Sequence, residues 1–196
     1  MFANRFTAFL DACTLASALK RNLLLTLAEA EFFRVRWSEP VLAETQRAIE
    51  QILANKGVED AADRALRARK GMEDAFEDAR VVDFDHLLSA SVGLPDPKDA
   101  HVVAAALKTQ AAVIVTDNLK DFPPALLRAL SLEARSADSF IADTIDLDHG
   151  RAVAAITKMR HRLRRPEKTA KVLLLDMEAA SLTQTADVLR PYENSL

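Results

Sequence analysis

The sequence predicts an α/β fold in which helices cover both faces of a parallel sheet and a helical extension follows. Short apolar runs typical of buried strands alternate with stretches of helical periodicity over residues 1–145. Residues 146–196 contain helical periodicity and no strand-like run. The chain has 196 residues, 49% of them hydrophobic, enough for one large domain or one ordinary domain with a small appendage. We therefore expect one domain over 1–145 and a helical extension over 146–196.

The first element of this alternation is a buried strand. Residues 6–10 form an apolar run bounded by polar residues, which is typical of a strand buried on both faces of a parallel sheet. Asp11 stands at the carboxyl end of this strand. Leucines then recur at helical spacing over 15–32, so we expect a helix that returns antiparallel to the strand.

Two helices are expected next. Ser38 precedes a Glu-Pro pair and can cap a helix, because its oxygen accepts a backbone hydrogen bond and proline is tolerated in the first turn. Glu44 lies early in this helix, and Gly57 ends it. Residues 58–79 are a second, heavily charged helical stretch, most of which must face water.

In the remainder of the chain, runs of valine and isoleucine indicate strands, whereas alanine-rich and leucine-rich stretches indicate helices. In chain order we expect a strand at 80–84, a turn at 95–98, a helix at 100–107, a strand at 111–115, a short helix at 123–130, a weak strand at 132–135, and helices at 136–145, 152–163, 169–177 and 182–189.

Composition and missing motifs exclude several classes of protein. The four glycines are scattered, so no glycine-rich loop can wrap a phosphate, and no G-x-S-x-G nucleophile elbow occurs. Cys13 is the single cysteine, which excludes an internal disulfide and a Cys-x-x-Cys site. No apolar run approaches the roughly 20 residues of a membrane helix, and no signal-peptide stretch is present. We expect a cytoplasmic protein with no membrane partner.

Charge is divided unevenly along the chain. The formal net charge is −3, but residues 1–150 carry net −7 and residues 151–196 carry net +4. An acidic metal site beside a basic surface for a polyanion would produce this asymmetry. A solvated, charged helix face would produce it equally well, so charge alone does not decide the function.

Carboxylates gather where the carboxyl ends of the predicted strands should lie. Asp11 and Asp117 each follow a strand, Asp96 and Asp99 open a helix, and Glu44 comes from the helix after Ser38. Ligands bind at the carboxyl edge of an open parallel sheet, and four or five carboxylates there would repel one another without a cation. Oxygen-only ligands select Mg²⁺ or Mn²⁺ over Zn²⁺, and two such ions are a standard device for phosphodiester cleavage.

Each of these acids also has a structural interpretation. Asp96 is an ideal N-cap with proline after it, Glu44 could be an exposed helix residue, and Asp11 could cap the helix that begins near Leu15. Asp11 is the hardest to dismiss, because an acid directly after a buried strand is costly to desolvate and usually has a partner.

Four motifs in order resemble the PIN-domain ribonucleases, particularly the VapC-like toxins. The motifs are Phe-Leu-Asp11-Ala, then Ser38-Glu-Pro-Val-Leu-Ala-Glu44, then Pro95-Asp96-Pro-Lys-Asp99-Ala-His-Val-Val-Ala-Ala-Ala, then Val113-Ile-Val-Thr116-Asp117-Asn118-Leu-Lys-Asp121-Phe122. Each motif alone is weak, but the order and spacing match over about 1–140. The resemblance implies a three-layer α/β/α sandwich and Mg²⁺- or Mn²⁺-dependent cleavage of RNA. It also implies that Asp11, Glu44 and Asp99 form the acidic core, and that an antitoxin protein is the partner.

The last motif departs from the family pattern. The usual Thr-x-Asp-x-Asp-Phe is replaced by a stretch in which Asn118 stands where the fourth acid is expected, with Asp117 and Asp121 on either side. We expect Asp117 to take the place of the fourth acid, because it directly follows Thr116 at the strand end. Thr116, Asn118 and Asp121 are auxiliary candidates, and the hydroxyl of Thr116 could orient a water or a phosphate.

Other candidate residues carry less weight. Cys13 is expected to be a small buried residue and His101 to lie on a helix surface. A basic cluster in the extension could contact RNA phosphates, although such a cluster is more often a solvated helix end; its arginines are Arg160, Arg162, Arg164 and Arg165. The apolar stripe of the extension must dock on the catalytic domain, on a second copy of the chain or on an antitoxin, and we expect the first.

The sequence therefore predicts a metal-dependent endoribonuclease, the toxin of a toxin–antitoxin pair. The alternative is a non-catalytic PIN-fold module that binds RNA or protein, and the asparagine at position 118 is its best support. A receiver domain is a poorer alternative, because receivers place a pair of adjacent acids after the first strand and Asp11 stands alone.

Overall fold

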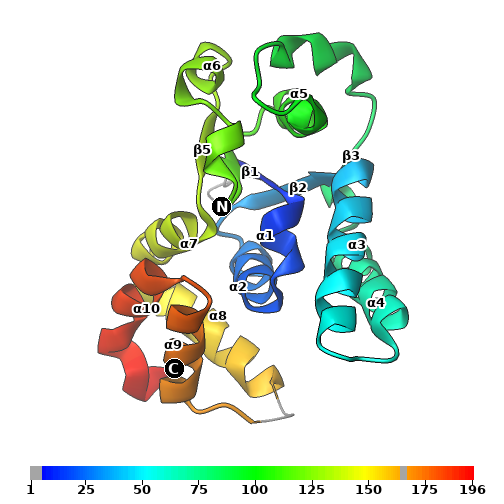
Figure 1. The fold of residues 1–196 in the computed structure, drawn as a ribbon. Helices are drawn as coiled ribbons and strands as arrows, with labels where there is room; N and C mark the ends of the chain where they lie inside the picture. Colours follow the sequence, from blue (N-terminus) through cyan, green and yellow to red (C-terminus); the bar gives the residue numbers. More distant parts are fainter. Residues whose placement is uncertain (1–5, 164–166) are drawn as a thin grey trace. The chain divides into compact units, whose positions relative to one another are not determined.

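Five parallel strands form one sheet, in the order β3-β2-β1-β4-β5 (Figure 1). The strands are β1 Thr7–Leu10, β2 Arg34–Ser38, β3 Arg80–Val81, β4 Val113–Val115 and β5 Glu133–Arg135. All four pairings are parallel, with Phe9 opposite Arg36 on one side and Ile114 on the other. The chain builds outward from β1 to β3, then returns to the other side of β1 for β4 and β5. The strand order therefore reverses between β1 and β4, the place where open α/β sheets bind ligands.

The computed structural model describes residues 6–163 and 167–196. The described residues form two compact units, a sheet unit of residues 6–17 and 34–135 and a helical unit of residues 18–33, 136–163 and 167–196. Because residues 18–33 and 136–145 group with the C-terminal helices, these units do not coincide with the predicted domains over 1–145 and 146–196. That division into domains stays a prediction.

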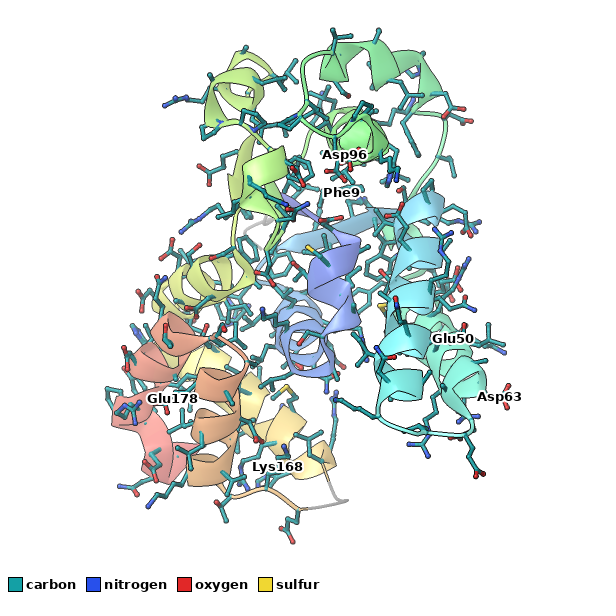
Figure 2. All side chains as sticks on the ribbon, viewed as in Figure 1. Phe9, Glu50, Asp63, Asp96, Lys168 and Glu178 are labelled. Carbon is teal, nitrogen blue, oxygen red and sulfur yellow. The ribbon has the colours of Figure 1, made fainter. Side chains whose placement is uncertain are left out.

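The helices of the sheet unit lie close to where the sequence places them, except that the helix expected over 15–32 is divided at Ser17 into Ala12–Ala16 and Ala18–Glu29. They are α1 Ala12–Ala16, α3 Glu39–Asn55, α4 Ala61–Ala75, α5 Ala100–Lys108 and α6 Pro124–Ala129, with 3-10 turns η1 Glu77–Ala79, η2 Asp85–Ser91, η3 Pro97–Asp99 and η4 Leu119–Asp121. Ser38 caps α3 as predicted, since its Oγ accepts a hydrogen bond from the Val41 amide. Gly57 follows α3 with a φ of +74°, a conformation that glycine adopts without steric cost. Figure 2 shows Glu50 and Asp63 on α3 and α4, and both are exposed.

Strand β2 was not predicted, although its pattern is present in the sequence. Val35 and Trp37 are buried and alternate with Arg34 and Arg36, which is the period-two pattern of a strand. The predicted strand at 80–84 is shorter than expected and ends at Val81. Two residues later the backbone of Asp83 has a φ of +57°, which is incompatible with extended structure.

The helical unit packs around its own apolar core. It contains α2 Ala18–Glu29, α7 Ala137–Asp146, α8 His149–Arg162, α9 Ala170–Ala179, α10 Thr183–Leu189 and the 3-10 turn η5 Arg190–Ser195. The rings of Phe33 and Phe140 meet edge to face, with centroids 5.0 Å apart. Leu173 and Leu189, from the expected apolar stripe, are fully buried, whereas Val172 remains exposed. Within the described part of the chain, no helix is long and apolar enough to cross a membrane.

The predicted fold class is confirmed: a parallel α/β sheet protein of the α/β/α sandwich type with helices after it.

Candidate active site

Asp11 and Thr116 meet at the point where the strand order reverses. Asp11 follows β1 and Thr116 follows β4, and the two strands are hydrogen-bonded neighbours, with the Asp11 amide donating to the Val115 carbonyl over 3.0 Å. The Thr116 hydroxyl donates to Asp11 Oδ2 over 2.7 Å, and the Ala12 amide donates to Oδ1 over 2.7 Å. Asp11 is 7% exposed and Thr116 is fully buried. The predicted acid at the end of the first strand is thus held rigidly, and it also caps α1.

Cys13 lies against the same pair of side chains. Its thiol donates to Asp11 Oδ2 over 3.1 Å, and its sulfur is 3.2 Å from Thr116 Oγ1. Burial, followed by the negative charge of Asp11, raises the pKa of Cys13 to about 11. The group is therefore a neutral thiol at physiological pH and a weak nucleophile. The residue as a whole is exposed, so the expectation of a small buried residue is wrong.

Asp99 is a carboxylate in an unfavourable electrostatic position at the start of α5. Its Oδ2 is buried and has no hydrogen-bond partner among the described residues. Burial raises the pKa of Asp99 to about 6, and the negative charges of Asp11, Asp96 and Asp121 add to the shift. Four predicted or auxiliary site residues therefore act on one another electrostatically. A cation between them would relieve this repulsion.

Asp96 has the structural role that its sequence context allowed. It is the N-cap of η3, and its Oδ1 accepts a hydrogen bond from the Lys98 amide over 2.9 Å. Figure 2 labels Asp96 in the segment that leads into α5, and Phe9 in strand β1. The capping bond occupies one carboxylate oxygen, while the charge still acts on Asp99. Asp96 therefore caps η3 and also places a negative charge near Asp99.

Glu44 of α3 contacts His101 of α5. His101 Nε2 lies 3.2 Å from Glu44 Oε1, with the histidine side chain 16% exposed and the glutamate 39% exposed. From the sequence we expect His101 on a helix surface, whereas the structure places it mostly buried beside a predicted metal ligand. Its position two residues after Asp99 on a helix was the signal that could have found it.

The last motif forms a turn held by its own polar groups. The Asn118 amide donates to Thr116 Oγ1 over 3.1 Å, and the Asn118 side chain donates to Asp121. The Asp117 side chain is exposed, and its backbone amide donates to the Cys13 sulfur over 3.3 Å. The charge of Asp121 contributes to the raised pKa of Asp99. The assignment of Asp117 as fourth acid stays a prediction.

Of the predicted RNA-contacting arginines, two lie in described residues. Arg160 donates to the Lys168 carbonyl over 2.7 Å, and Arg162 pairs with Glu29 of α2 at 3.1 Å. Both belong to the helical unit and are engaged within it. Arg164 and Arg165 lie outside the described residues. Contact between this cluster and RNA stays a prediction.

The donor set fits a hard divalent cation by chemistry. In residues 6–163 and 167–196, no group of three or more His, Cys, Asp or Glu side chains is placed so that it could hold a metal ion. The buried, unpartnered Oδ2 of Asp99 nevertheless carries a charge that the surrounding carboxylates disfavour. Carboxylate oxygens are the ligands that Mg²⁺ and Mn²⁺ prefer, so the residues present suit such an ion.

Comparison with known proteins decides the family. The model of the PIN domain matches residues 7–120, which is more than half of the chain. The chain belongs to the PIN-domain family. The matched range contains Asp11, Glu44, Asp99 and Asp117, so these residues lie within the PIN domain as predicted from the sequence. The resemblance drawn from the four motifs is confirmed.

A second family model, the VapC50 C-terminal domain, matches residues 137–191 of this PIN-domain protein. That range covers helices α7 to α10. A relative from Mycobacterium tuberculosis, named "Putative ribonuclease VapC50", is 44% identical over 62 residues, which are 32% of this chain and 37% of the relative. The match thus spans little more than a third of the relative. No solved structure matches.

Proposed function

We propose that this protein is a ribonuclease that hydrolyses RNA phosphodiester bonds with the help of Mg²⁺ or Mn²⁺. Membership of the PIN-domain family and the name of the M. tuberculosis relative support this reaction class. The observation that carries the proposal is the buried, unpartnered Oδ2 of Asp99, whose pKa is raised to about 6 by burial and by neighbouring carboxylates. Such a carboxylate is unstable as an isolated anion and suited to a cation.

Asp11, Glu44 and Asp99 would hold the cation in this proposal. A bound divalent cation supplies positive charge that activates water for attack on phosphorus and stabilises the leaving oxygen. The residues of the chain fix the geometry. Thr116 holds Asp11 Oδ2, and the Ala12 amide holds Oδ1, so this carboxylate does not need to reorganise when RNA binds.

We propose Asp121 as an alternative to the predicted Asp117 for the place of the fourth acid. The charge of Asp121 raises the pKa of Asp99, and the Asn118 side chain orients the Asp121 carboxylate. We therefore favour Asp121 over Asp117, with Asp96 as a further acid near the cation. A Mg²⁺ titration of cleavage tests this: Asp121→Ala should raise the required Mg²⁺ concentration more than Asp117→Ala does. The reverse ranking would restore the assignment made from the sequence.

We further propose that the protein acts as a toxin whose partner is an antitoxin protein. The VapC50 C-terminal match over 137–191 supports this, because it extends the likeness beyond the PIN domain. Co-expression with the product of the neighbouring gene tests the pairing. A small co-purifying protein that suppresses cleavage is the expected result. Full cleavage activity of the chain in the presence of every neighbouring gene product would contradict it.

The central experiment measures cleavage of a mixed RNA substrate by the purified protein. We expect cleavage with Mg²⁺ or Mn²⁺, none in EDTA, and loss by orders of magnitude in Asp99→Asn, since metal-assisted charge stabilisation lowers the barrier by several kcal/mol. Asp63→Asn on the exposed face of α4 is the matched control and should cleave normally. A folded Asp99→Asn variant with unchanged activity would overturn the proposal and favour the non-catalytic binding module.

A further inference from the structure

Glu44 differs from the other acids of the proposed site in how it is held. Asp11 is fixed by two strong hydrogen bonds and Asp96 by a capping bond. Glu44 projects from the second turn of α3 on a longer side chain that is 39% exposed. A glutamate in this setting samples several rotamers, and ordering it in one of them costs conformational entropy. The proposed cation site therefore requires a contact that holds this carboxylate in one orientation.

His101 is the group that contacts Glu44. Its Nε2 lies 3.2 Å from Glu44 Oε1, and the two residues come from different helices, α3 and α5. Its other ring nitrogen, Nδ1, is buried and has no hydrogen-bond partner among the described residues. The polar contact of the ring is therefore made through Nε2, the atom that faces Glu44.

The histidine is also tied to the position of Asp99. Asp99 is the N-cap of α5, and His101 is the second residue of that helix. His101 acts electrostatically on Asp99 as well. One short rigid segment therefore presents the Asp99 carboxylate and the imidazole that contacts Glu44. The contact between His101 and Glu44 therefore links this segment to a residue that lies 55 positions before Asp99 in the chain.

We propose that His101 is a positioning residue that orients Glu44 for the divalent cation by donating a hydrogen bond from Nε2. This inference rests on the cation site of the proposed function and deepens it. His101 is not itself a ligand in this arrangement, because Nε2 is used by Glu44. Hydrogen-bonded partners behind metal-binding carboxylates commonly alter metal affinity by roughly 10–100-fold when removed.

The test uses three substitutions that separate the donor atom from the ring. His101→Gln places an amide nitrogen at the reach of Nε2, His101→Asn places one at the reach of the other ring nitrogen, and His101→Leu removes the donor while keeping bulk. The measured quantity is the affinity for Mn²⁺, followed by electron paramagnetic resonance of the free ion. His86→Leu, at an exposed imidazole of η2, is the matched control.

We expect Mn²⁺ to bind His101→Leu and His101→Asn roughly tenfold more weakly than the unaltered protein, whereas His101→Gln and His86→Leu bind it normally. Normal affinity of His101→Leu would overturn the inference. Equal weakening in His101→Gln and His101→Leu would also overturn it, because the ring would then act as a packing element and not as a donor.

A second measurement in metal-free protein reads the positioning directly. Side-chain scalar couplings of Glu44, measured by NMR, should report one dominant rotamer in the unaltered protein and in His101→Gln, and averaged rotamers in His101→Leu. Averaged rotamers in the unaltered protein would overturn the inference. Failure of the unaltered protein to bind Mn²⁺, with a fixed Glu44 rotamer lost in His101→Leu, would instead overturn the proposed cation site and leave the contact intact.

Discussion

At the level of single residues, Asp99 carries much of the electrostatic strain of the site. Its carboxylate loses solvation and faces three other acids, so its ionised form is disfavoured in the folded protein. The residue therefore opposes folding when no cation is bound. A side chain retained at a cost to stability is typical of a functional site.

Asp99→Asn should raise the free energy of unfolding of the metal-free protein by about 1 kcal/mol near neutral pH. The gain is small because solvent screens the charge of this partly exposed side chain. The pKa of Asp99 is about 6 in the folded protein, above the ordinary value of 3.8 for an aspartate. Asp99 therefore does not oppose folding below the lower value, and its cost to stability develops as the pH rises through the higher one. Urea unfolding in EDTA should therefore show the gain at neutral pH and none near pH 4. Asp63→Asn is the control. A gain that is equal at both pH values would contradict the electrostatic explanation.

Thr116→Val tests the support of Asp11 at the same scale. Valine keeps the shape of threonine but removes the hydroxyl that donates to Asp11 Oδ2 and accepts from the Asn118 amide. Leaving these buried groups unpaired should cost about 1–3 kcal/mol in the free energy of unfolding. RNA cleavage should fall by roughly 10–100-fold, as for other groups that orient metal ligands. Thr116→Ser, which keeps the hydroxyl, should retain most of the activity, and an equal loss in both variants would count against the hydrogen bond.

At the level of elements, a buried carboxylate joins two helices of the helical unit. Asp138 of α7 accepts hydrogen bonds from the Thr185 amide and hydroxyl, both over 2.8 Å, and from the Gln184 amide over 3.0 Å. The first turn of α10 is thus capped by a side chain from a neighbouring helix, because Leu182 at its own N-cap offers no oxygen.

Asp138→Ala should lower the free energy of unfolding of the helical unit by about 2–3 kcal/mol, since several buried donors lose a charged acceptor. Amide hydrogen exchange should show faster exchange in α7 and α10 and unchanged protection in β1 and β4. Asp187→Ala, at an exposed position of α10, provides the comparison and should change little. Unchanged protection of α10 in the Asp138 variant would show that apolar packing alone holds the helix.

The difference between the predicted and observed elements has a physical pattern. Strand β1 and helix α3 were predictable, because the apolar run before Asp11 and the cap at Ser38 are local signals. Strand β2 was not predicted, because two arginines, Arg34 and Arg36, alternate with its buried residues. Charged residues at this density are more typical of an exposed connection than of a strand within a sheet. The left-handed backbone at Asp83 that stops β3 leaves no signal in residue composition.

At the level of the whole molecule, binding of a cation should be coupled to folding. An ion that binds the folded protein and not the unfolded chain stabilises it by about 2.7 kcal/mol at one hundred times its dissociation constant. Thermal unfolding should therefore shift upward with added Mn²⁺ in the unaltered protein and remain constant in Asp99→Asn. An equal shift in both proteins would place the ion elsewhere.

The sequence indicates which residues gather at the candidate site more clearly than it indicates how their side chains are arranged. The carboxyl-edge rule brought Asp11 and Asp99 to one region, and the raised pKa of Asp99 agrees with that grouping. His101 and the bond between Asn118 and Asp121 were not predictable, because each depends on which way a side chain turns in three dimensions. Helix α2 belongs to the same compact unit as the C-terminal helices. This grouping was not predictable, because it depends on contacts between segments more than one hundred residues apart, such as the ion pair of Arg162 with Glu29.

The pairing of β1 with β4 also determines when the site can exist during protein synthesis. Asp11 leaves the ribosome early, whereas its hydrogen-bond donor Thr116 is made 105 residues later. Every shorter nascent chain lacks the Thr116 hydroxyl and the part of the last motif that follows it, and most of them also lack β4 and Asp99. An aborted or truncated product that ends before this point therefore cannot assemble the acidic site. Any cleavage activity would belong to chains whose translation has passed Thr116.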